Sequence, residues 1–339
     1  MNIINNTHAG SRIPATIISG FLGSGKTTLL NRILQANTQV RAAVLVNDFG
    51  KINIDSKLIK NHDGKVMSLA NGCICCSISD DLMGQLDDML NSDNPPESLI
   101  IEASGVSDPG RIARILGYKM FRDRVRIDAI VNVLDASQLD KVSEDFKDLT
   151  QWQLKQADIV VINKTDLCSA KQLEQLKADW LTPDKRVFET SFAKVPMALI
   201  LGVDVHAEHT ETDGCHEGCA QQGHHHTHDE SHDHHLNDQH DDIFESIAWQ
   251  CDQVLEFSRL EALIKNLPKD IYRAKGIFNV GQKHTGRLVL QLVGARIDWS
   301  EEITREADDS RSYLIMIAQK NKVDFTAVKN TLDAMVAVI

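Results

Sequence analysis

Residues 20–27, with the sequence Gly-Phe-Leu-Gly-Ser-Gly-Lys-Thr, constrain the fold of this chain more than any other segment. Glycines at this spacing let a backbone turn its N–H groups inward around phosphate oxygens, while the lysine neutralises phosphate charge and the threonine hydroxyl can hold Mg²⁺. An apolar run precedes the segment, and an amphipathic stretch follows it. The sequence therefore predicts a phosphate-binding loop between a strand and a helix.

Short β-branched apolar runs alternate with amphipathic stretches from residue 15 to about residue 190. The runs expected to form strands are residues 15–19, 42–46, 99–102, 129–134, 159–163 and 187–190. Helices are expected between them, for example at residues 26–35, 80–90 and 170–180. Strands that are apolar on both faces and separated by helices indicate a covered parallel sheet, so the pattern predicts an α/β domain with helices on both faces of a mostly parallel sheet.

The pattern of residues 243–339 predicts a smaller α+β domain. Strands are expected at residues 246–254, 276–280, 288–293 and 313–318, and helices at residues 257–266 and 325–336. The predicted organisation is a tail at residues 1–12, a P-loop domain at 13–202, a linker at 203–242 and a C-terminal domain at 243–339.

Nearly all of the net charge of −12 lies in residues 203–242, which contain eleven acidic residues, no lysine or arginine, and eleven of the fourteen histidines. The rest of the chain carries a net charge of only −1, which argues against a nucleic-acid surface built on a broad basic patch. No apolar run reaches the roughly 18 residues that cross a bilayer, and the polar start lacks a signal-peptide core. We therefore expect a cytoplasmic protein without a membrane partner.

Two further segments predict a guanine-nucleotide site. Glu102 ends an apolar run and Gly105 follows, as is needed to hold Mg²⁺ and to let a backbone N–H approach a γ-phosphate. The segment Asn163-Lys164-Thr165-Asp166 follows another run and is similar to the guanine-recognition tetrad of GTPases. Its carboxylate would accept from the ring N–H and exocyclic amine of guanine, and adenine presents the opposite pattern. Residues 190–194 could supply a last base contact.

The predicted nucleotide-binding residues are Gly20, Gly23, Ser24, Gly25, Lys26, Thr27, Thr28, Gly105, Asn163, Lys164 and Asp166. Lys26, Thr27 and Glu102 are the predicted catalytic residues, which act through charge and by positioning Mg²⁺ on Thr27 and Glu102. No side chain is visibly placed to orient the attacking water, so slow intrinsic turnover is expected.

Cys73, Cys75 and Cys76 lie in a polar, glycine-containing segment. Three thiols this close cannot all pair with one another, but three thiolates can bind one soft metal ion and leave a fourth tetrahedral position for another ligand. The alternative is that they are small buried apolar residues. Their clustering favours a metal site, and the number of thiolates favours zinc without excluding cobalt.

The linker histidines suit loose binding of several ions of Zn²⁺, Co²⁺ or Ni²⁺. The candidate ligands are His224, His225, His226, His228, His232, His234 and His235. A solvated linker that binds metal only incidentally is the alternative.

These residues together resemble the CobW-like family of P-loop GTPases, whose better understood members are nucleotide-dependent metallochaperones, zinc chaperones among them. The resemblance rests on the phosphate loop, the Cys-X-Cys-Cys segment, Glu102, the tetrad and Arg273-Ala274-Lys275-Gly276, and it covers residues 13 to about 339. It implies GTP hydrolysis coupled to the binding of a divalent metal, usually zinc, and its delivery to a client metalloprotein.

Two features depart from the family pattern. Asp48 stands where the family commonly has Glu, which shortens the reach of this possible metal ligand. Residues 1–12 contain no recognisable docking motif, so the client stays unidentified; a homodimer is the default for an oligomer. Two alternative functions are delivery of cobalt or another metal to a cofactor pathway or a specific metalloenzyme, and metal storage or sensing with a nucleotide switch.

Overall fold

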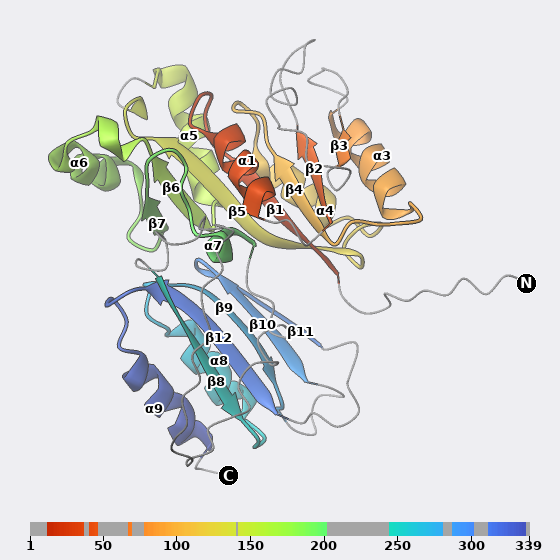
Figure 1. The fold of residues 1–339 in the computed structure, drawn as a ribbon, viewed down its shortest axis with the longest axis vertical. Helices are drawn as coiled ribbons and strands as arrows, with labels where there is room; N and C mark the ends of the chain where they lie inside the picture. Colours follow the sequence, from red (N-terminus) through yellow and green to blue (C-terminus); the bar gives the residue numbers. More distant parts are fainter. Residues whose placement is uncertain are drawn as a thin grey trace, which may run out of the picture.

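A seven-stranded parallel sheet is followed along the chain by a five-stranded antiparallel sheet (Figure 1). The computed structural model describes residues 12–36, 41–46, 67–69, 78–139, 142–201, 244–280, 287–301 and 311–336. No helix in these ranges is long and apolar enough to cross a membrane. The predicted α/β domain followed by a smaller α+β domain is confirmed.

The parallel sheet has the strand order β3-β2-β4-β1-β5-β6-β7. Its strands are β1 (Ile13–Ser19), β2 (Ala42–Val46), β3 (Met67–Leu69), β4 (Ser98–Glu102), β5 (Val125–Asp135), β6 (Ile159–Asn163) and β7 (Arg186–Glu189). Strand β1 lies between β4 and β5, so the loop that leaves its carboxyl end stands at the centre of the edge where ligands of open α/β sheets bind.

Helices cover both faces of this sheet. They are α1 (Lys26–Ala36), α3 (Ile78–Leu90), α4 (Pro109–Leu116), α5 (Glu144–Gln156), α6 (Ala170–Trp180) and α7 (Met197–Leu201). Helices α1 and α7 pack on one face through a core that includes Leu30 and Ile200. Helices α3 to α6 pack on the other face, through residues such as Leu86, Ile115 and Leu154.

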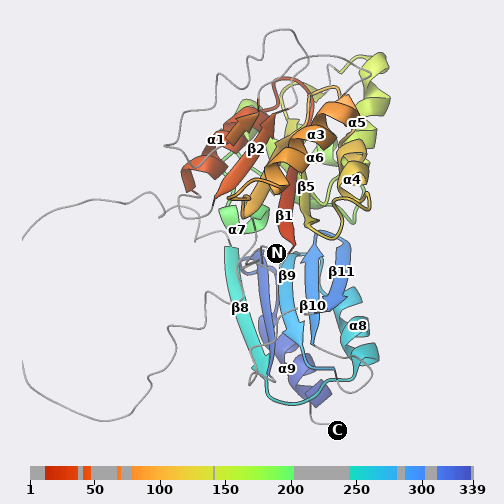
Figure 2. The same cartoon turned by 90° about the vertical axis from the view of Figure 1, so that its right-hand side faces the viewer.

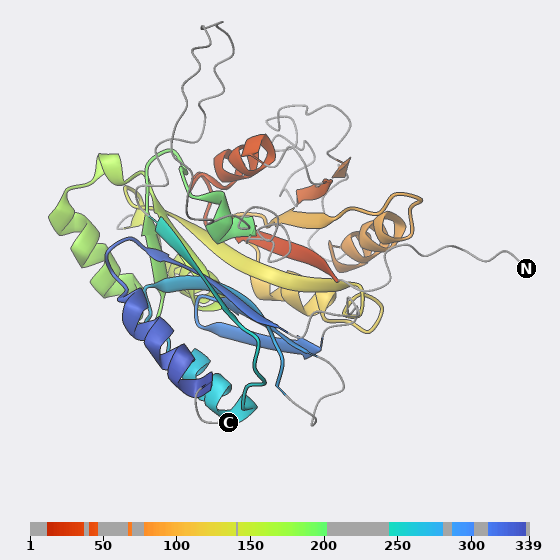
Figure 3. The same ribbon diagram turned by 60° about the horizontal axis from the view of Figure 1, so that its bottom comes forward.

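The antiparallel sheet has the order β11-β10-β9-β12-β8. It is built from β8 (Phe244–Cys251), β9 (Ile271–Phe278), β10 (Leu288–Val293), β11 (Arg296–Glu301) and β12 (Ser312–Gln319). Helices α8 (Phe257–Lys265) and α9 (Phe325–Val336) lie together on one side of it (Figure 3). Their apolar residues form a second core with the sheet.

Strand β9 differs from its predicted range because it begins at Ile271 rather than at residue 276. The polar side chain of Arg273 interrupts the apolar pattern, yet it is buried because it pairs with Asp128 of the other domain. Strand β11 was not predicted, since it is a half-exposed edge strand of mixed polarity.

Apolar side chains join the two domains. Phe244 at the start of β8 packs against Phe188 of β7 and Tyr272 of β9, with ring centroids 5.5 and 5.3 Å apart. The Tyr272 hydroxyl donates to the Val187 carbonyl at 2.7 Å. Burial raises the pKa of Tyr272 to about 12, so this donor stays protonated. Figure 2 shows the five-stranded sheet extending downward from the parallel-sheet domain.

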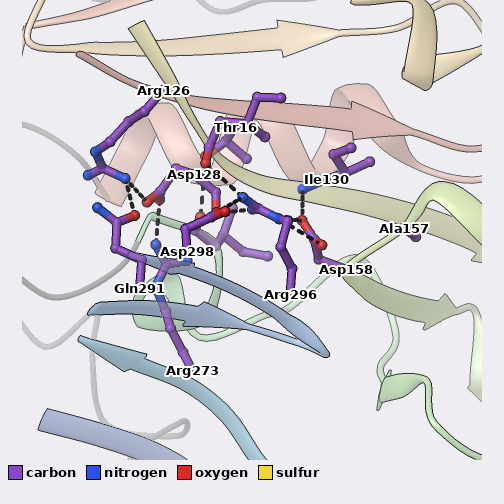
Figure 4. A network of polar contacts seen from close by, with 12 residues as sticks. Thr16, Arg126, Asp128, Ile130, Ala157, Asp158, Arg273, Gln291, Arg296 and Asp298 are labelled. Atoms are coloured by element: carbon purple, nitrogen blue, oxygen red, sulfur yellow. Dashed lines mark hydrogen bonds and ion pairs between the residues drawn. The ribbon is translucent and has the colours of Figure 1, made fainter. Parts of the chain in front are cut away.

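A polar network also joins the two domains (Figure 4). Arg273 donates to Asp128 at 2.5 Å and to the Leu199 carbonyl at 3.1 Å. Arg126 also pairs with Asp128, at 2.7 Å. Arg296 pairs with Asp158 at 3.0 Å and donates to the Asp128 carbonyl at 2.8 Å. Ion pairs between the two domains, one fully buried and one partly buried, thus hold the domains together.

Candidate nucleotide site

The segment between β1 and α1 has the backbone conformation that its glycines make possible. Gly20, Gly23 and Gly25 have φ angles of +132°, +73° and +109°, a region that other residues rarely adopt. A Cβ atom at Gly20 would overlap the Val133 carbonyl, and one at Gly25 would overlap the Asn163 amide. Helix α1 begins directly after this turn, at Lys26. The predicted loop between strand and helix is therefore present.

The side chains predicted to act on phosphate and Mg²⁺ meet next to this loop. Lys26 is mostly buried, and its ammonium group donates to the Phe21 carbonyl at 3.2 Å. The Thr27 hydroxyl donates to a carboxylate oxygen of Glu102 at 2.9 Å. Strand pairing explains this contact, because Glu102 of β4 stands opposite Ile18 of β1. A hydroxyl and a carboxylate oxygen so close together fit one hard cation. Ser24 lies in the same loop, and Thr28 lies in the first turn of α1.

Gly105 lies against the phosphate loop. A Cβ atom there would stand 2.8 Å from the Leu22 backbone nitrogen, so only glycine allows this approach. The segment then turns into α4, whose first turn is capped when the Asp108 carboxylate accepts from the Gly110 N–H at 2.8 Å.

The tetrad is fastened to the phosphate loop by two of its side chains. Asn163 donates to the Ser24 carbonyl at 2.9 Å and accepts from the Ala193 N–H at 2.8 Å. Lys164 has a φ of +62°, and its ammonium group donates to the Gly23 carbonyl at 2.8 Å. Asp166 is exposed, with its backbone N–H donating to the Ser191 hydroxyl at 3.2 Å. The structure thus brings the phosphate loop, the tetrad and residues 190–194 together.

Two residues of this site carry no motif in the sequence. Asp135, at the carboxyl end of β5, accepts from the Lys164 ammonium group at 2.5 Å. Gln153 of α5 donates to carbonyls of the segment that contains Gly105. The only sequence signal that could have placed Asp135 in the site is a carboxylate at the end of an apolar run. Nothing in the sequence pattern of α5 distinguishes Gln153 from its neighbours.

The predicted metal ligands lie outside the described residues. They are Asp48, Cys73, Cys75, Cys76, His224, His225, His226, His228, His232, His234 and His235. Within the described ranges no three side chains of metal-binding type cluster. The elements on either side of the cysteines are described, and these are β3 and α3.

Two family models match the chain. The CobW/HypB/UreG nucleotide-binding domain matches residues 14–187, and the cobalamin synthesis protein cobW C-terminal domain matches residues 244–336. This chain belongs to the CobW/HypB/UreG family. The nucleotide-binding match spans the phosphate loop, Glu102 and the tetrad, and the second match spans the antiparallel sheet and its helices.

Relatives of this CobW-family protein include zinc chaperones and zinc-regulated GTPases. The zinc chaperone CobW of Sinorhizobium sp is 30% identical over 355 residues, covering 96% of this chain and 98% of its own length. The zinc-regulated GTPase metalloprotein activator 1 of Dictyostelium discoideum is 31% identical over 229 residues, 56% of this chain and 48% of its own. The Zn(II)-bound YjiA GTPase of E. coli superposes with a TM-score of 0.43 at 20% identity, covering 96% and 99% of the two chains.

Proposed function

We propose that this protein is a GTP-hydrolysing metallochaperone that binds zinc at Cys73, Cys75 and Cys76 and delivers it to a client metalloprotein. The observation that carries the proposal is the convergence of the phosphate loop, Glu102 and the tetrad at one edge of the parallel sheet. Similarity to zinc chaperones over nearly the whole chain supports the choice of metal.

Guanine selection is assigned to Asp166. Its exposed carboxylate stands on the turn that Asn163 and Lys164 fasten to the phosphate loop, so the base and the phosphates of one nucleotide can be held at the same time. A carboxylate at this place accepts from the two donors of guanine and leaves adenine without a matching partner.

Phosphoryl transfer is assigned to Lys26, Thr27 and Glu102. The Lys26 ammonium group would neutralise phosphate charge, and Thr27 and Glu102 would hold Mg²⁺. When bound, Mg²⁺ supplies further positive charge to the phosphates. In this proposal these residues neutralise charge and position Mg²⁺, and slow intrinsic turnover is expected of the isolated protein.

The position of β3 supports coupling between the cysteines and the nucleotide. Leu69 pairs with Leu45 of β2, and Leu45 pairs with Ile101 of β4, so the chain leaves β3 at the level just before Glu102. Two strand spacings are only about 10 Å. We therefore propose that GTP with Mg²⁺ changes the geometry of the cysteine ligands, so that metal and GTP affinities are reciprocally coupled.

The histidines of residues 203–242 are proposed as additional, weaker metal sites. Imidazole with an ordinary pKa near ~6.5 is a ligand only when neutral, so acidification would release metal from this segment.

The test is a competitive zinc titration against a chromogenic chelator, on the full chain and on a variant with Cys73→Ser, Cys75→Ser and Cys76→Ser. Each protein is titrated with GDP and with a non-hydrolysable GTP analogue and Mg²⁺. We expect one tight zinc site that is missing from the variant and whose affinity changes at least tenfold with the nucleotide, about 1.4 kcal/mol of coupling. Equal zinc affinity in both nucleotide states would contradict a GTP-gated carrier.

The same titration with Co²⁺ distinguishes the alternative metal. Tighter, nucleotide-dependent cobalt binding at the cysteines would indicate cobalt delivery, since Co²⁺ accepts similar ligands. Metal binding that survives the triple substitution and ignores the nucleotide would indicate storage by the histidine-rich segment instead.

A further inference from the structure

Gln153 of α5 is completely buried and holds the chain segment that follows Glu102. Its amide nitrogen donates to the Ser107 carbonyl at 2.9 Å and to the Gly105 carbonyl at 3.3 Å. One side chain on a neighbouring helix thus fixes two carbonyls of a short turn.

The same turn fixes the direction of the Gly105 N–H group. The backbone N–H and the hydroxyl of Ser107 both donate to the Ser104 carbonyl, at 3.0 and 2.9 Å. A trans peptide is planar, with its N–H pointing opposite to its C=O. Holding the Ser104 carbonyl therefore sets where the Gly105 N–H points. Gln153 secures this arrangement from outside, because it holds Ser107 and the next carbonyl along the chain.

Helix α5 supports the phosphate loop as well as this turn. Phe146 of α5 packs against Phe21 of the phosphate loop, with ring centroids 5.2 Å apart. Gly105 approaches Leu22 of the same loop. Helix α5 therefore contacts both the phosphate loop and the turn that contains Gly105, in addition to the pairing of β4 with β1.

A glutamine at this position carries a cost as well as a benefit. The amide oxygen of Gln153 is buried and makes no hydrogen bond within the described part of the chain. A buried polar atom without a partner costs free energy, and an apolar side chain of similar shape would avoid that cost but would leave the Gly105 and Ser107 carbonyls without this donor. The donor function of the amide nitrogen is what glutamine adds.

We propose that Gln153 is a positioning residue that orients the Gly105 N–H toward the third phosphate and so makes the site discriminate GTP from GDP. This inference rests on the proposed GTPase function. In the proposed site, the tetrad and residues 20–27 would hold the base and the first two phosphates without Gln153, so only the additional phosphate of GTP would depend on the turn.

The test compares three variants for their affinity for GDP and for a non-hydrolysable GTP analogue, and for single-turnover hydrolysis. Gln153→Met removes the donor and keeps the size of the side chain. Ser107→Ala removes one of the two bonds to the Ser104 carbonyl. Gln151→Met is the matched control, because Gln151 is exposed on the same helix.

We expect Gln153→Met to weaken binding of the GTP analogue and to slow hydrolysis about tenfold, while GDP affinity changes less than twofold. Ser107→Ala should show the same selective loss at about threefold, which keeps the test informative should Gln153→Met fold poorly. Gln151→Met should match the parent protein.

Equal losses for GDP and the GTP analogue would overturn the inference, because they would show a structural role only. An unchanged ratio of the two affinities in both turn variants would overturn it as well. If the parent protein binds neither nucleotide, the proposed GTPase function fails together with the inference.

Discussion

The two ends of strand β5 use an aspartate in opposite ways. Near the amino end, Asp128 is 1% exposed, and its carboxylate pairs with Arg126 and Arg273. Arg296 donates to the backbone carbonyl of the same residue. At the carboxyl end, Asp135 pairs with Lys164, whose side chain is one-third exposed. The amino end, here called the closed end, joins the two domains. The carboxyl end, here called the open end, leaves a charged pair next to a surface where a ligand can enter.

The surroundings of the two ends agree with this division. The domain interface combines the Asp128 network with packed aromatic rings. At the open end, the apolar side chains of Leu22 and Phe192 are 59% and 66% exposed. We therefore expect substitutions at the closed end to reduce stability, and substitutions at the open end to reduce nucleotide affinity.

The largest effect should come from Arg273→Met. It leaves the buried Asp128 carboxylate with one guanidinium partner fewer, and breaking a buried ion pair costs about 3 kcal/mol or more of unfolding free energy. Urea unfolding measures this loss. The matched control is Arg259→Met, which breaks a solvent-exposed pair with Glu256 and should cost less than about 0.5 kcal/mol. Similar losses of unfolding free energy in both variants would contradict the expected difference between the buried and the exposed ion pair.

Acid should weaken the closed end next. Burial alone would raise the pKa of Asp128, but the charges of Arg273, Arg126 and Lys275 outweigh it and lower the pKa to about 2. A carboxyl whose folded pKa is depressed contributes stability above its unfolded pKa and loses it as the pH falls toward the folded pKa. We therefore expect about 2 kcal/mol to disappear between roughly pH 4 and pH 2.

The measurement for this effect is unfolding free energy against pH for the parent protein and for Asp128→Asn. The parent should show the steeper slope below pH 4. Parallel curves would mean that Asp128 is not held in its charged form.

At the open end, Asp135→Asn should weaken binding of GDP and GTP equally, by about tenfold or 1.4 kcal/mol. The neutral side chain no longer attracts Lys164, which fastens the tetrad to Gly23. Equilibrium binding of both nucleotides checks this. Asp148→Asn, at an exposed position of α5, should leave both affinities unchanged. A loss confined to GTP would assign Asp135 to the turn at Gly105 instead.

The smallest effect on turnover is expected from replacing residues 203–242 by a glycine-serine chain of the same length. The number of bound metal ions should fall, because the proposed histidine ligands are removed, while GTP turnover stays within about twofold. Metal analysis and a phosphate-release assay measure the two quantities. A collapse of turnover would show that this segment takes part in catalysis or in holding the domains together.

Much of the fold could be predicted from the sequence because buried parallel strands are continuous apolar runs. Strands β2, β6 and β10 and helices α6 and α9 have the predicted bounds. The start of β9 and the whole of β11 could not be predicted. Both contain an arginine whose burial depends on a partner in the other domain, Arg273 with Asp128 and Arg296 with Asp158.

The candidate site also contains residues that could be predicted from the sequence and residues that could not. Residues 20–27 and the tetrad are local motifs whose spacing is visible in the sequence. Gln153 and Asp135 are not, because each acts on a residue far along the chain: Ser107 is 46 residues from Gln153, and Lys164 is 29 residues from Asp135. Only the folded sheet and its helices bring these pairs together.

The chain leaves the parallel-sheet domain at Leu201 and enters the antiparallel sheet at Phe244, and both side chains pack against the same apolar cluster. The ends of the intervening segment are therefore pinned near one another by the folded domains. The free energy of closing a loop grows only with the logarithm of its length, by about 0.6 kcal/mol for each doubling. Insertions or deletions of histidines between these two anchors would thus alter the number of proposed metal ligands at almost no cost to either domain. Under the proposed function, metal capacity would then be a trait that can change independently of the fold.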